Sequence, residues 1–265
     1  MVETQSDYDF RFSGIARLWG QKGLNALRSA HVCIVGIGGV GSWVAEAIAR
    51  SGVGEITLVD LDDICTSNVN RQLHALDGAI GQPKVDIMAK RIAAINPDCR
   101  VHARHAFYNE RTSDELLGVD YDLVIDAIDA LYKKCHLIVA CKNKQLPLVV
   151  VGSAGGRTDP TLVQTADLSR SFHDPLLQKV RKRLRQKYGF PRNERKKFRI
   201  DCVFSPEEMI YPQPDGTVCS EKVPEANLKL DCESGYGTAS FITGTFGFVA
   251  AAVAVRRIVE HASVE

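Results

Sequence analysis

A glycine-rich segment, GIGGVG, has a spacing that serves nucleotide binding. Gly36, Gly38 and Gly41 follow the apolar run HVCIV and precede an amphipathic stretch. The first glycine permits a tight turn, the second lets backbone N–H groups approach a phosphate, and the third lets a helix pack closely on a strand. The segment, with Gly39 inside it, therefore predicts a phosphate-binding turn; a merely tight strand-to-helix turn is the alternative.

The residues after the next apolar run bear on which nucleotide binds. Asp60 ends EITLVD, nineteen residues after Gly41, where an acid can hydrogen-bond ribose hydroxyls of either NAD or ATP. The following LDDICTSNVNRQ and GQPK add a polar, cationic group that suits a triphosphate during phosphoryl release and that a dehydrogenase does not need. We therefore predict ATP, bound by Gly36, Gly38, Gly39, Gly41, Asp60, Asp62, Asn68, Arg71, Gln72 and Lys84.

Two carboxylates end another apolar run, in VIDAID. Asp126 and Asp129 would lie at the carboxyl edge of a parallel sheet, where ligands bind in such folds. A carboxylate there suits Mg²⁺, and we assign Asp129 to that role. The alternative for both is capping the helix that begins at LYKKC.

These residues need a framework of strands alternating with helices. Apolar runs at 31–35, 55–60, 101–106, 121–129 and 146–154 read as strands, and helical patterns lie at 11–29, at 83–96, opened by Pro83, and at 131–144. Further short strands are expected in IDCVFS and EEMIYP. The expected fold is α/β, a Rossmann-like, doubly wound and mainly parallel sheet with C-terminal extension strands and a basic helical insert.

Five characteristic segments follow one another along the chain: GIGGVGS, LVDLDD, SNVNRQ, GQPK and DAIDA. Across about residues 10–157 they closely resemble the ubiquitin-activating-enzyme-like adenylyltransferases, which include enzymes that activate sulfur-carrier proteins. The resemblance implies that ATP is cleaved to AMP and pyrophosphate while a carboxylate becomes an acyl-adenylate. It also implies that Asp60 binds ribose, that Arg71 and Lys84 hold phosphates, and that Asp129 positions Mg²⁺.

The same resemblance implies a homodimer. The family uses an arginine from the partner subunit's N-terminal arm, in a segment reading RYNRQ, where this chain reads RFSGIARL. Arg11 matches the first arginine, but Gly14 stands at the functional one. We assign the role to Arg17 instead; an exposed arm residue without such a role is the alternative.

Residues 170–199 form a strongly basic segment. They hold twelve lysines or arginines against two acids, whereas the rest of the chain carries a net charge of −9. Within it, PLLQKVRKRLRQKYG places apolar residues on one helical face and cations around the remainder, which suits RNA phosphates. A solvated charged face is the alternative. The candidate RNA-binding residues here are Lys179, Arg181, Lys182, Arg183, Arg185, Lys187, Arg195, Lys196 and Lys197.

Over nearly its whole length the chain resembles the branch of that superfamily that dehydrates threonylcarbamoyladenosine in tRNA. The matching segments include RFSGIARLWG, NVNRQLHAL, GSAGGRTDPT, DPLLQKVRKRL, YPQPDGTVC and DCESGYG. The resemblance implies tRNA as the partner, adenylation of the threonyl carboxylate, and displacement of AMP by a ureido atom beside the anticodon. A cysteine desulfurase or sulfur-acceptor system is a further partner that it implies.

Three other functions stay open at this point. Adenylation of a ubiquitin-like sulfur carrier is opposed by the lack of any C-x-x-C pair, which also predicts no zinc site. A nicotinamide dehydrogenase is opposed by Arg71, Lys84 and Asp129. A non-catalytic nucleotide- and RNA-binding scaffold is opposed by the same three residues.

Two more residues are candidates for contact with substrate. Cys232, in KLDCESGYG, stands where related enzymes carry a catalytic cysteine, and its thiolate could hold an acyl group. Intramolecular attack needs no such step, so a structural thiol is the alternative. Arg157, after Gly155 and Gly156, is expected to contact tRNA.

Composition and apolar pattern define the expected organisation and location. We expect an N-terminal helical arm at 1–30, an ATP-binding core at 31–157, and a tRNA-binding part at 158–265. The last would hold the basic helix 170–199, a flexible loop 205–236 and a core helix 238–262.

The uncharged run 239–255 is slightly short for a membrane span, so we expect a buried helix, with membrane association as the weaker alternative. An acidic start without an apolar run and cysteines inside apolar runs point to reduced thiols in the cytoplasm.

Overall fold

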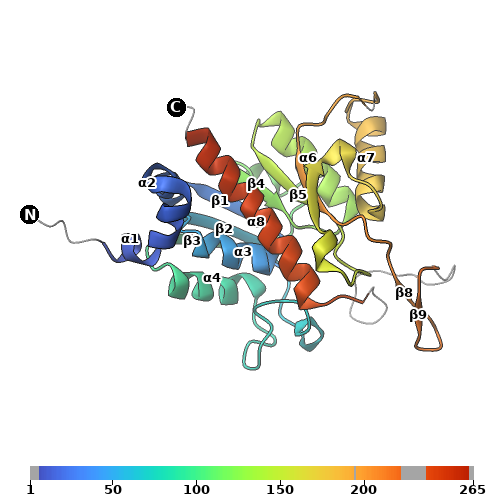
Figure 1. The fold of residues 1–265 in the computed structure, drawn as a ribbon, viewed down its shortest axis with the longest axis horizontal. Helices are drawn as coiled ribbons and strands as arrows, with labels where there is room; N and C mark the ends of the chain where they lie inside the picture. Colours follow the sequence, from blue (N-terminus) through green and yellow to red (C-terminus); the bar gives the residue numbers. More distant parts are fainter. Residues whose placement is uncertain (1–5, 194, 222–236, 263–265) are drawn as a thin grey trace, which may run out of the picture.

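The computed structural model describes residues 6–193, 195–221 and 237–262, and its centre is a seven-stranded sheet with the order β3-β2-β1-β4-β5-β7-β6 (Figure 1). The strands of this sheet are β1 His31–Val35, β2 Glu55–Asp60, β3 Arg100–His105, β4 Leu123–Asp126, β5 Leu148–Val151, β6 Gln164–Asp167 and β7 Asp201–Phe204. All neighbours are parallel except β6 and β7. The prediction of a mainly parallel, doubly wound α/β fold is confirmed.

Helices cover both faces of this sheet. They are α1 Asp7–Arg11, α2 Ser13–Ser29, α3 Gly41–Arg50, α4 Lys84–Ile95, α5 Ser113–Leu116, α6 Leu131–Asn143, α7 Pro175–Lys187 and α8 Ser240–Ala262. Short 3₁₀ turns are η1 Thr66–Asn68, η2 Pro160–Leu162 and η3 Leu168–Arg170, and a small hairpin pairs β8 Tyr211–Pro212 with β9 Val218–Cys219.

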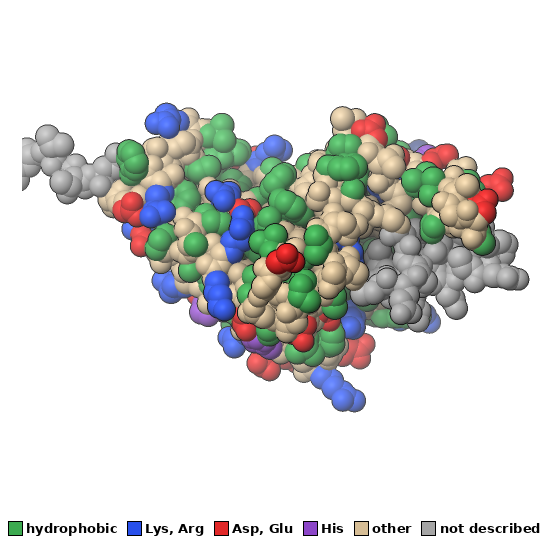
Figure 2. Space-filling model, turned by 90° about the horizontal axis from the view of Figure 1, so that it is seen from below, with side chains coloured by type: hydrophobic (Ala, Val, Ile, Leu, Met, Phe, Trp, Pro, Cys, Tyr) green, Lys and Arg blue, Asp and Glu red, His purple; other side chains and the backbone are tan. Residues whose placement is uncertain are grey.

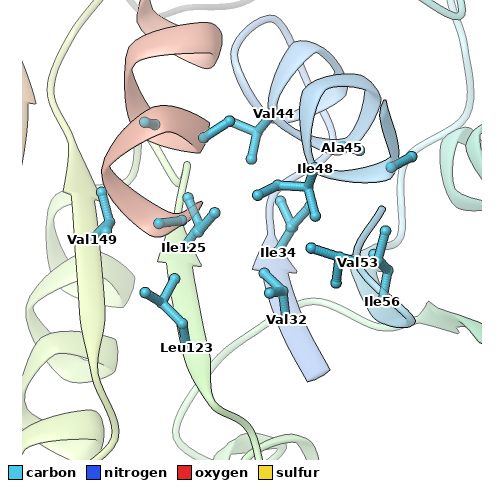
Figure 3. Packing of buried hydrophobic residues seen from close by; sticks show 14 of the residues in the cluster. Val32, Ile34, Val44, Ala45, Ile48, Val53, Ile56, Leu123, Ile125 and Val149 are labelled. Atoms are coloured by element: carbon cyan, nitrogen blue, oxygen red, sulfur yellow. The ribbon is translucent and has the colours of Figure 1, made fainter. Parts of the chain in front are cut away.

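Two apolar clusters hold the layers together, because alternate side chains of a strand point to opposite faces. In β1, Val32 and Ile34 pack with α3, α4 and α8, whereas Cys33 and Val35 pack with α6 and α7. Figure 3 shows the first cluster, in which Val44 and Ile48 of α3 meet side chains of the central strands. The central strands β1, β4 and β5 are therefore buried on both faces, as their continuous apolar runs predict.

The C-terminal helix α8 is long and apolar enough to cross a membrane by length and composition, but 61% of its apolar window is buried inside the protein. It runs across α2 and α3 (Figure 1). At Gly247 a side chain would come within 2.6 Å of Trp43 and 3.0 Å of a backbone oxygen, so the glycine permits close packing on α3. The expected core helix is confirmed as an element of the fold.

The structure corrects three details. The basic helix runs from Pro175 to Lys187 rather than from 170 to 199, because Asp174 caps its start, and beyond its end Gly189 has a positive φ of 67° and Pro191 follows. Strand β6 went unpredicted, since QTAD lacks apolar alternation and pairs only as the antiparallel edge of β7. The strand expected in EEMIYP shrinks to two residues of the β8–β9 hairpin, and the rest of the expected loop from 222 to 236 lies outside the described residues.

Candidate active site

A cavity of about 470 Å³ opens at the carboxyl ends of β1, β2, β4 and β5. It lies where the chain order in the sheet reverses, between β1 and β4, the position at which doubly wound sheets bind ligands. Its volume is ordinary for a small-molecule site. Of the predicted nucleotide-binding residues, the cavity is lined by Gly36, Gly38, Gly39, Asp60, Asp62, Asn68, Arg71, Gln72 and Lys84, and Asp129 lies on its rim.

The glycine turn forms the floor of this cavity. Gly36 has a φ of 92°, and a side chain there would lie 3.0 Å from the carbonyl oxygen of Ala127. Gly41 starts α3 and does not line the cavity. A side chain at Gly41 would lie 1.8 Å from the Gly36 carbonyl oxygen, so its absence lets the helix close on the strand. The N-terminus of α3 therefore points at the cavity, where it favours an anion.

Asp60 ties this turn to β2. Its Oδ2 accepts the backbone N–H of Ile37 at 2.7 Å, and its Oδ1 accepts that of Asp62 at 2.9 Å. Each carboxylate oxygen keeps a second lone-pair direction, so the group can still accept a hydroxyl. The geometry agrees with the expected contact to ribose.

Lys84, at the start of α4, is the most enclosed cation of the cavity. The residue is 6% exposed, and its Nζ lies 2.8 Å from Asp62 Oδ2. The Asp62 side chain is 52% exposed, so it can turn to solvent at little cost when a phosphate takes its place beside the lysine. The pair therefore presents a buried positive charge with a replaceable counterion.

The segment Ser67–Gln72 builds one wall. Asn68 Oδ1 accepts the backbone N–H of Cys65, which fixes the η1 turn. Arg71 folds back to donate to the Ser67 carbonyl oxygen at 2.6 Å, and its own carbonyl oxygen accepts from Trp43 and Thr243. The buried Oε1 of Gln72 has no partner among the described residues, so it is available to a bound ligand.

A fully buried ion pair lies beneath the opposite wall. Lys134 Nζ is 2.8 Å from Asp126 Oδ1, and both side chains are 0% exposed. Burial raises the pKa of Asp126, which Lys134 opposes. Neither Asp126 nor Asp129 caps α6, since its first residue follows Ala130 without a side-chain cap, so the capping alternative is wrong. Asp129 is instead an exposed carboxylate on the cavity rim, an oxygen donor that fits Mg²⁺.

Several lining residues went unpredicted. Lys133 adds a cation, Phe107 a ring, Cys65 an exposed thiol, and Ser153 and Thr243 polar groups. Cys65 lies in sequence between two predicted residues, and Lys133 follows Asp129 closely, so position alone could have found them. Thr243 could not be found in this way, because it comes from α8, far along the chain.

Of the remaining predicted catalytic residues, one does not reach the cavity of this chain and the other lies outside the described residues. Arg17 is exposed on α2 and is absent from the lining. Cys232 lies outside the described residues.

The buried position of Arg157 contradicts the prediction that this residue contacts tRNA. It is 3% exposed, and its guanidinium donates to the carbonyl oxygens of Ser153, His173 and Glu207. Burial lowers the pKa of the group. Arg157 therefore ties the loop after β5 to two distant segments and is enclosed rather than presented to a phosphate at the surface.

The other predicted RNA-binding cations do lie near the surface of one region. Exposed members are Lys179, Lys182, Lys187, Arg195, Lys196 and Lys197, and half-buried ones are Arg181, Arg183 and Arg185. A groove of about 550 Å³ beside α7 is lined by Arg181, Lys182, Arg185 and Arg192 together with two glutamines. By contrast, the face in Figure 2 mixes Lys and Arg side chains with acidic and apolar ones.

Helix α7 is fixed to the cavity through Asp174. This N-cap carboxylate accepts the backbone N–H of Leu177 at 2.9 Å and that of Ser153 at 2.8 Å, while only 1% of the residue is exposed. Burial raises the pKa of Asp174. Because Ser153 lines the cavity, the basic helix and the cavity wall share one buried anchor.

The ThiF family model matches residues 13–265, nearly the whole chain. The chain belongs to the ThiF family. Within it, the tRNA threonylcarbamoyladenosine dehydratase of Escherichia coli (strain K12) is 48% identical over 254 residues, covering 96% of this chain and 95% of that protein. The enzyme of the same name from Haemophilus influenzae is 46% identical, covering 97% and 96%.

A solved ThiF-family structure also matches. The crystal structure of E. coli tRNA N6-threonylcarbamoyladenosine dehydratase, TcdA, in complex with ATP superposes with a TM-score of 0.87 at 42% identity, covering 99% of each chain. The likeness therefore includes the basic segment and α8 as well as the glycine turn.

Proposed function

We propose that this ThiF-family chain is an ATP-dependent enzyme that dehydrates threonylcarbamoyladenosine in tRNA. One observation carries the proposal: a single cavity unites the glycine turn, Lys84, Arg71 and Asp129, in a chain that matches tRNA threonylcarbamoyladenosine dehydratases from end to end.

ATP binds across the switch point of the sheet. Its phosphates lie over the glycine turn at the N-terminus of α3, and Asp60 accepts from the ribose. A phosphate of ATP replaces Asp62 as the partner of Lys84. Arg71 turns from the Ser67 carbonyl oxygen toward the same phosphate. These cations stabilise the charge that moves onto pyrophosphate as it leaves.

The reaction has two balanced steps. An oxygen of the threonyl carboxylate attacks the α-phosphorus, and the bond to pyrophosphate breaks. A ureido atom of the same substrate then attacks the acyl carbon, loses its proton, and expels AMP. The nucleoside loses one water in total. Activation is needed because a free carboxylate is a poor electrophile, whereas AMP is a good leaving group.

Three further parts of the proposal concern the metal ion, the oligomeric state with its location, and a protein partner. Asp129 would hold Mg²⁺, which supplies charge neutralisation to the phosphates. The chain would act as a homodimer in the cytoplasm, with Arg17 of each arm entering the partner's cavity. A cysteine desulfurase or sulfur-acceptor system would be a further partner. The dimer is tested by light scattering: a monomer at working concentration would remove the Arg17 assignment.

The function is tested by mass spectrometry of nucleosides. tRNA that carries threonylcarbamoyladenosine is incubated with the protein, ATP and Mg²⁺, digested and analysed. We expect the nucleoside to lose one water only when ATP is present. An unchanged mass, with protein shown to bind ATP, would overturn the proposal.

Adenylation of a sulfur-carrier protein has no specific observation in its favour. The basic surface of α7 offers phosphates a site and is unsuited to a neutral peptide tail. Pyrophosphate exchange that depended on a carrier protein and not on tRNA would reverse this preference.

A further inference from the structure

Two exposed aromatic rings each have a cation over them: Phe107 lines the cavity, and Tyr132 precedes the lining residue Lys133 in the chain. Tyr132, in the first turn of α6, is 66% exposed, and Arg183 Cζ lies 4.3 Å from its ring centroid. Phe107 is 45% exposed, and Lys133 Nζ lies 4.5 Å from its centroid. An exposed aromatic side chain with a cation stacked on it offers a partner both apolar area and positive charge.

Arg183 is held by this ring contact. Its Nε is buried and has no hydrogen-bond acceptor among the described residues, and no carboxylate within that part of the chain pairs with it. A guanidinium stacked on an aromatic face is stabilised electrostatically. The guanidinium covers one face of the Tyr132 ring, and the high exposure of the residue leaves the rest of the ring open.

The rings stand between the two regions already described. Phe107 and Lys133 line the cavity, Tyr132 is the next residue on α6, and Arg183 belongs to α7. Helices α6 and α7 pack against each other (Figure 1). A strand of RNA that runs from the cations of α7 into the cavity by way of α6 would therefore pass close to these rings.

We propose that Tyr132, backed by Arg183, is a stacking platform for an unpaired base of the tRNA anticodon loop. The inference rests on the proposed function, because a modified adenosine can reach the cavity only if the loop is splayed and neighbouring bases lose their stacking. Aromatic and arginine planes replace such stacking in proteins that bind single-stranded RNA. Phe107 supplies a second ring nearer the cavity.

Exposure alone does not make a platform. Phe248, on α8, is also well exposed at 50%, but it does not line the cavity, and no cation lies over its ring among the described residues. It therefore serves as a matched control for the loss of an exposed aromatic side chain.

Binding of fluorescently labelled tRNA is measured by anisotropy without ATP, so the result does not depend on turnover. We expect Tyr132→Ala to weaken affinity at least about fivefold, whereas Tyr132→Phe and Tyr132→Trp retain it and Phe248→Ala has no effect. The slope of log affinity against log salt stays unchanged in Tyr132→Ala, because stacking releases no counterions. In Lys182→Ala the slope falls by about one.

The outcomes separate the platform from the proposed function. Wild-type affinity in Tyr132→Ala, or equal losses in Tyr132→Ala and Tyr132→Phe, would overturn the platform alone if the wild type binds and dehydrates tRNA. A wild-type protein that neither binds nor dehydrates tRNA would overturn the function and the platform together. Circular dichroism and thermal melting check that each variant is folded.

Discussion

Lys84 and Lys182 are both lysines on helices of the same chain, yet their surroundings differ completely. Lys84 is 6% exposed and holds Asp62 at 2.8 Å, whereas Lys182 is exposed on α7. Beneath the cavity wall, Lys134 is likewise paired with Asp126. Among the described residues, the exposed cations of α7 have no carboxylate partner.

The contrast separates two uses of charge. A buried, paired cation has one geometry and acts on one group, so replacing that single residue has a large effect. Exposed cations of one sign attract a polyanion together, and the logarithm of the affinity falls with the logarithm of salt concentration with a slope that grows with the number of phosphates they neutralise. We therefore assign chemistry to the cavity and RNA affinity to the basic segment.

The largest effect is expected from Lys134→Met. It leaves Asp126 buried without its partner, and breaking such a pair costs about 3–5 kcal/mol of stability. Urea unfolding would measure the loss. Adding Asp126→Asn to the same variant removes the uncompensated charge and should recover much of it. A loss below about 1 kcal/mol in the single variant would show that the buried pair does not behave as described.

Lys84→Ala should lower kcat for dehydration by about 10²–10³-fold, because a positioned charge at the developing pyrophosphate is lost. Stability should change little, since Asp62 is half-exposed and can be solvated alone. Lys90→Ala, at an exposed position of the same helix, is the control and should keep wild-type rates. Equal rates in Lys84→Ala and Lys90→Ala would remove Lys84 from the chemistry.

Replacing Lys179, Lys182 and Lys187 together by Ala should weaken tRNA binding and leave ATP binding unchanged. The slope of log affinity against log salt should become shallower by about 2–3, close to one for each phosphate that is no longer neutralised. Filter binding at several salt concentrations measures the slope. An unchanged slope would mean that α7 presents only a solvated charged face.

The smallest effect concerns how the end of the basic segment is attached. Asp167 accepts backbone N–H groups of Ser169, Phe198 and Arg199, and although burial alone would raise its pKa, these hydrogen bonds hold the pKa below its usual value. The stability that Asp167 contributes is therefore present above the ordinary carboxyl range and lost as pH falls through it and below.

Thermal melting between pH 6 and pH 3 tests this attachment. The wild type should lose more Tm on acidification than Asp167→Asn, and the two should converge at the acid end. A constant difference between them across the whole range would contradict the assignment.

Sequence reasoning located those site residues whose roles depend on local backbone. Gly36, Gly38 and Asp60 could be placed because a strand, a turn and a helix follow one another with fixed spacing. Lys84 could be placed because Pro83 marks the start of α4, although Pro83 caps the helix rather than entering it.

Residues whose surroundings come from distant segments were misplaced or missed. Arg157 follows two glycines and reads as a surface cation, but carbonyl oxygens of His173 and Glu207 enclose it. Thr243 reaches the cavity only because α8 folds back over α3. Tyr132 can be recognised as a candidate stacking site only once the structure shows that α7 places Arg183 over its ring. No local pattern encodes such contacts.

The division between cavity and basic segment is tested most directly by steady-state kinetics of dehydration in which the tRNA concentration is varied. Lys84→Ala should lower kcat and leave the KM for tRNA near its wild-type value. The triple lysine variant of α7 should raise that KM and leave kcat near its wild-type value. If both variants changed kcat and KM in the same proportion, the cavity and the basic segment would not have separate roles, and the division between them would be contradicted.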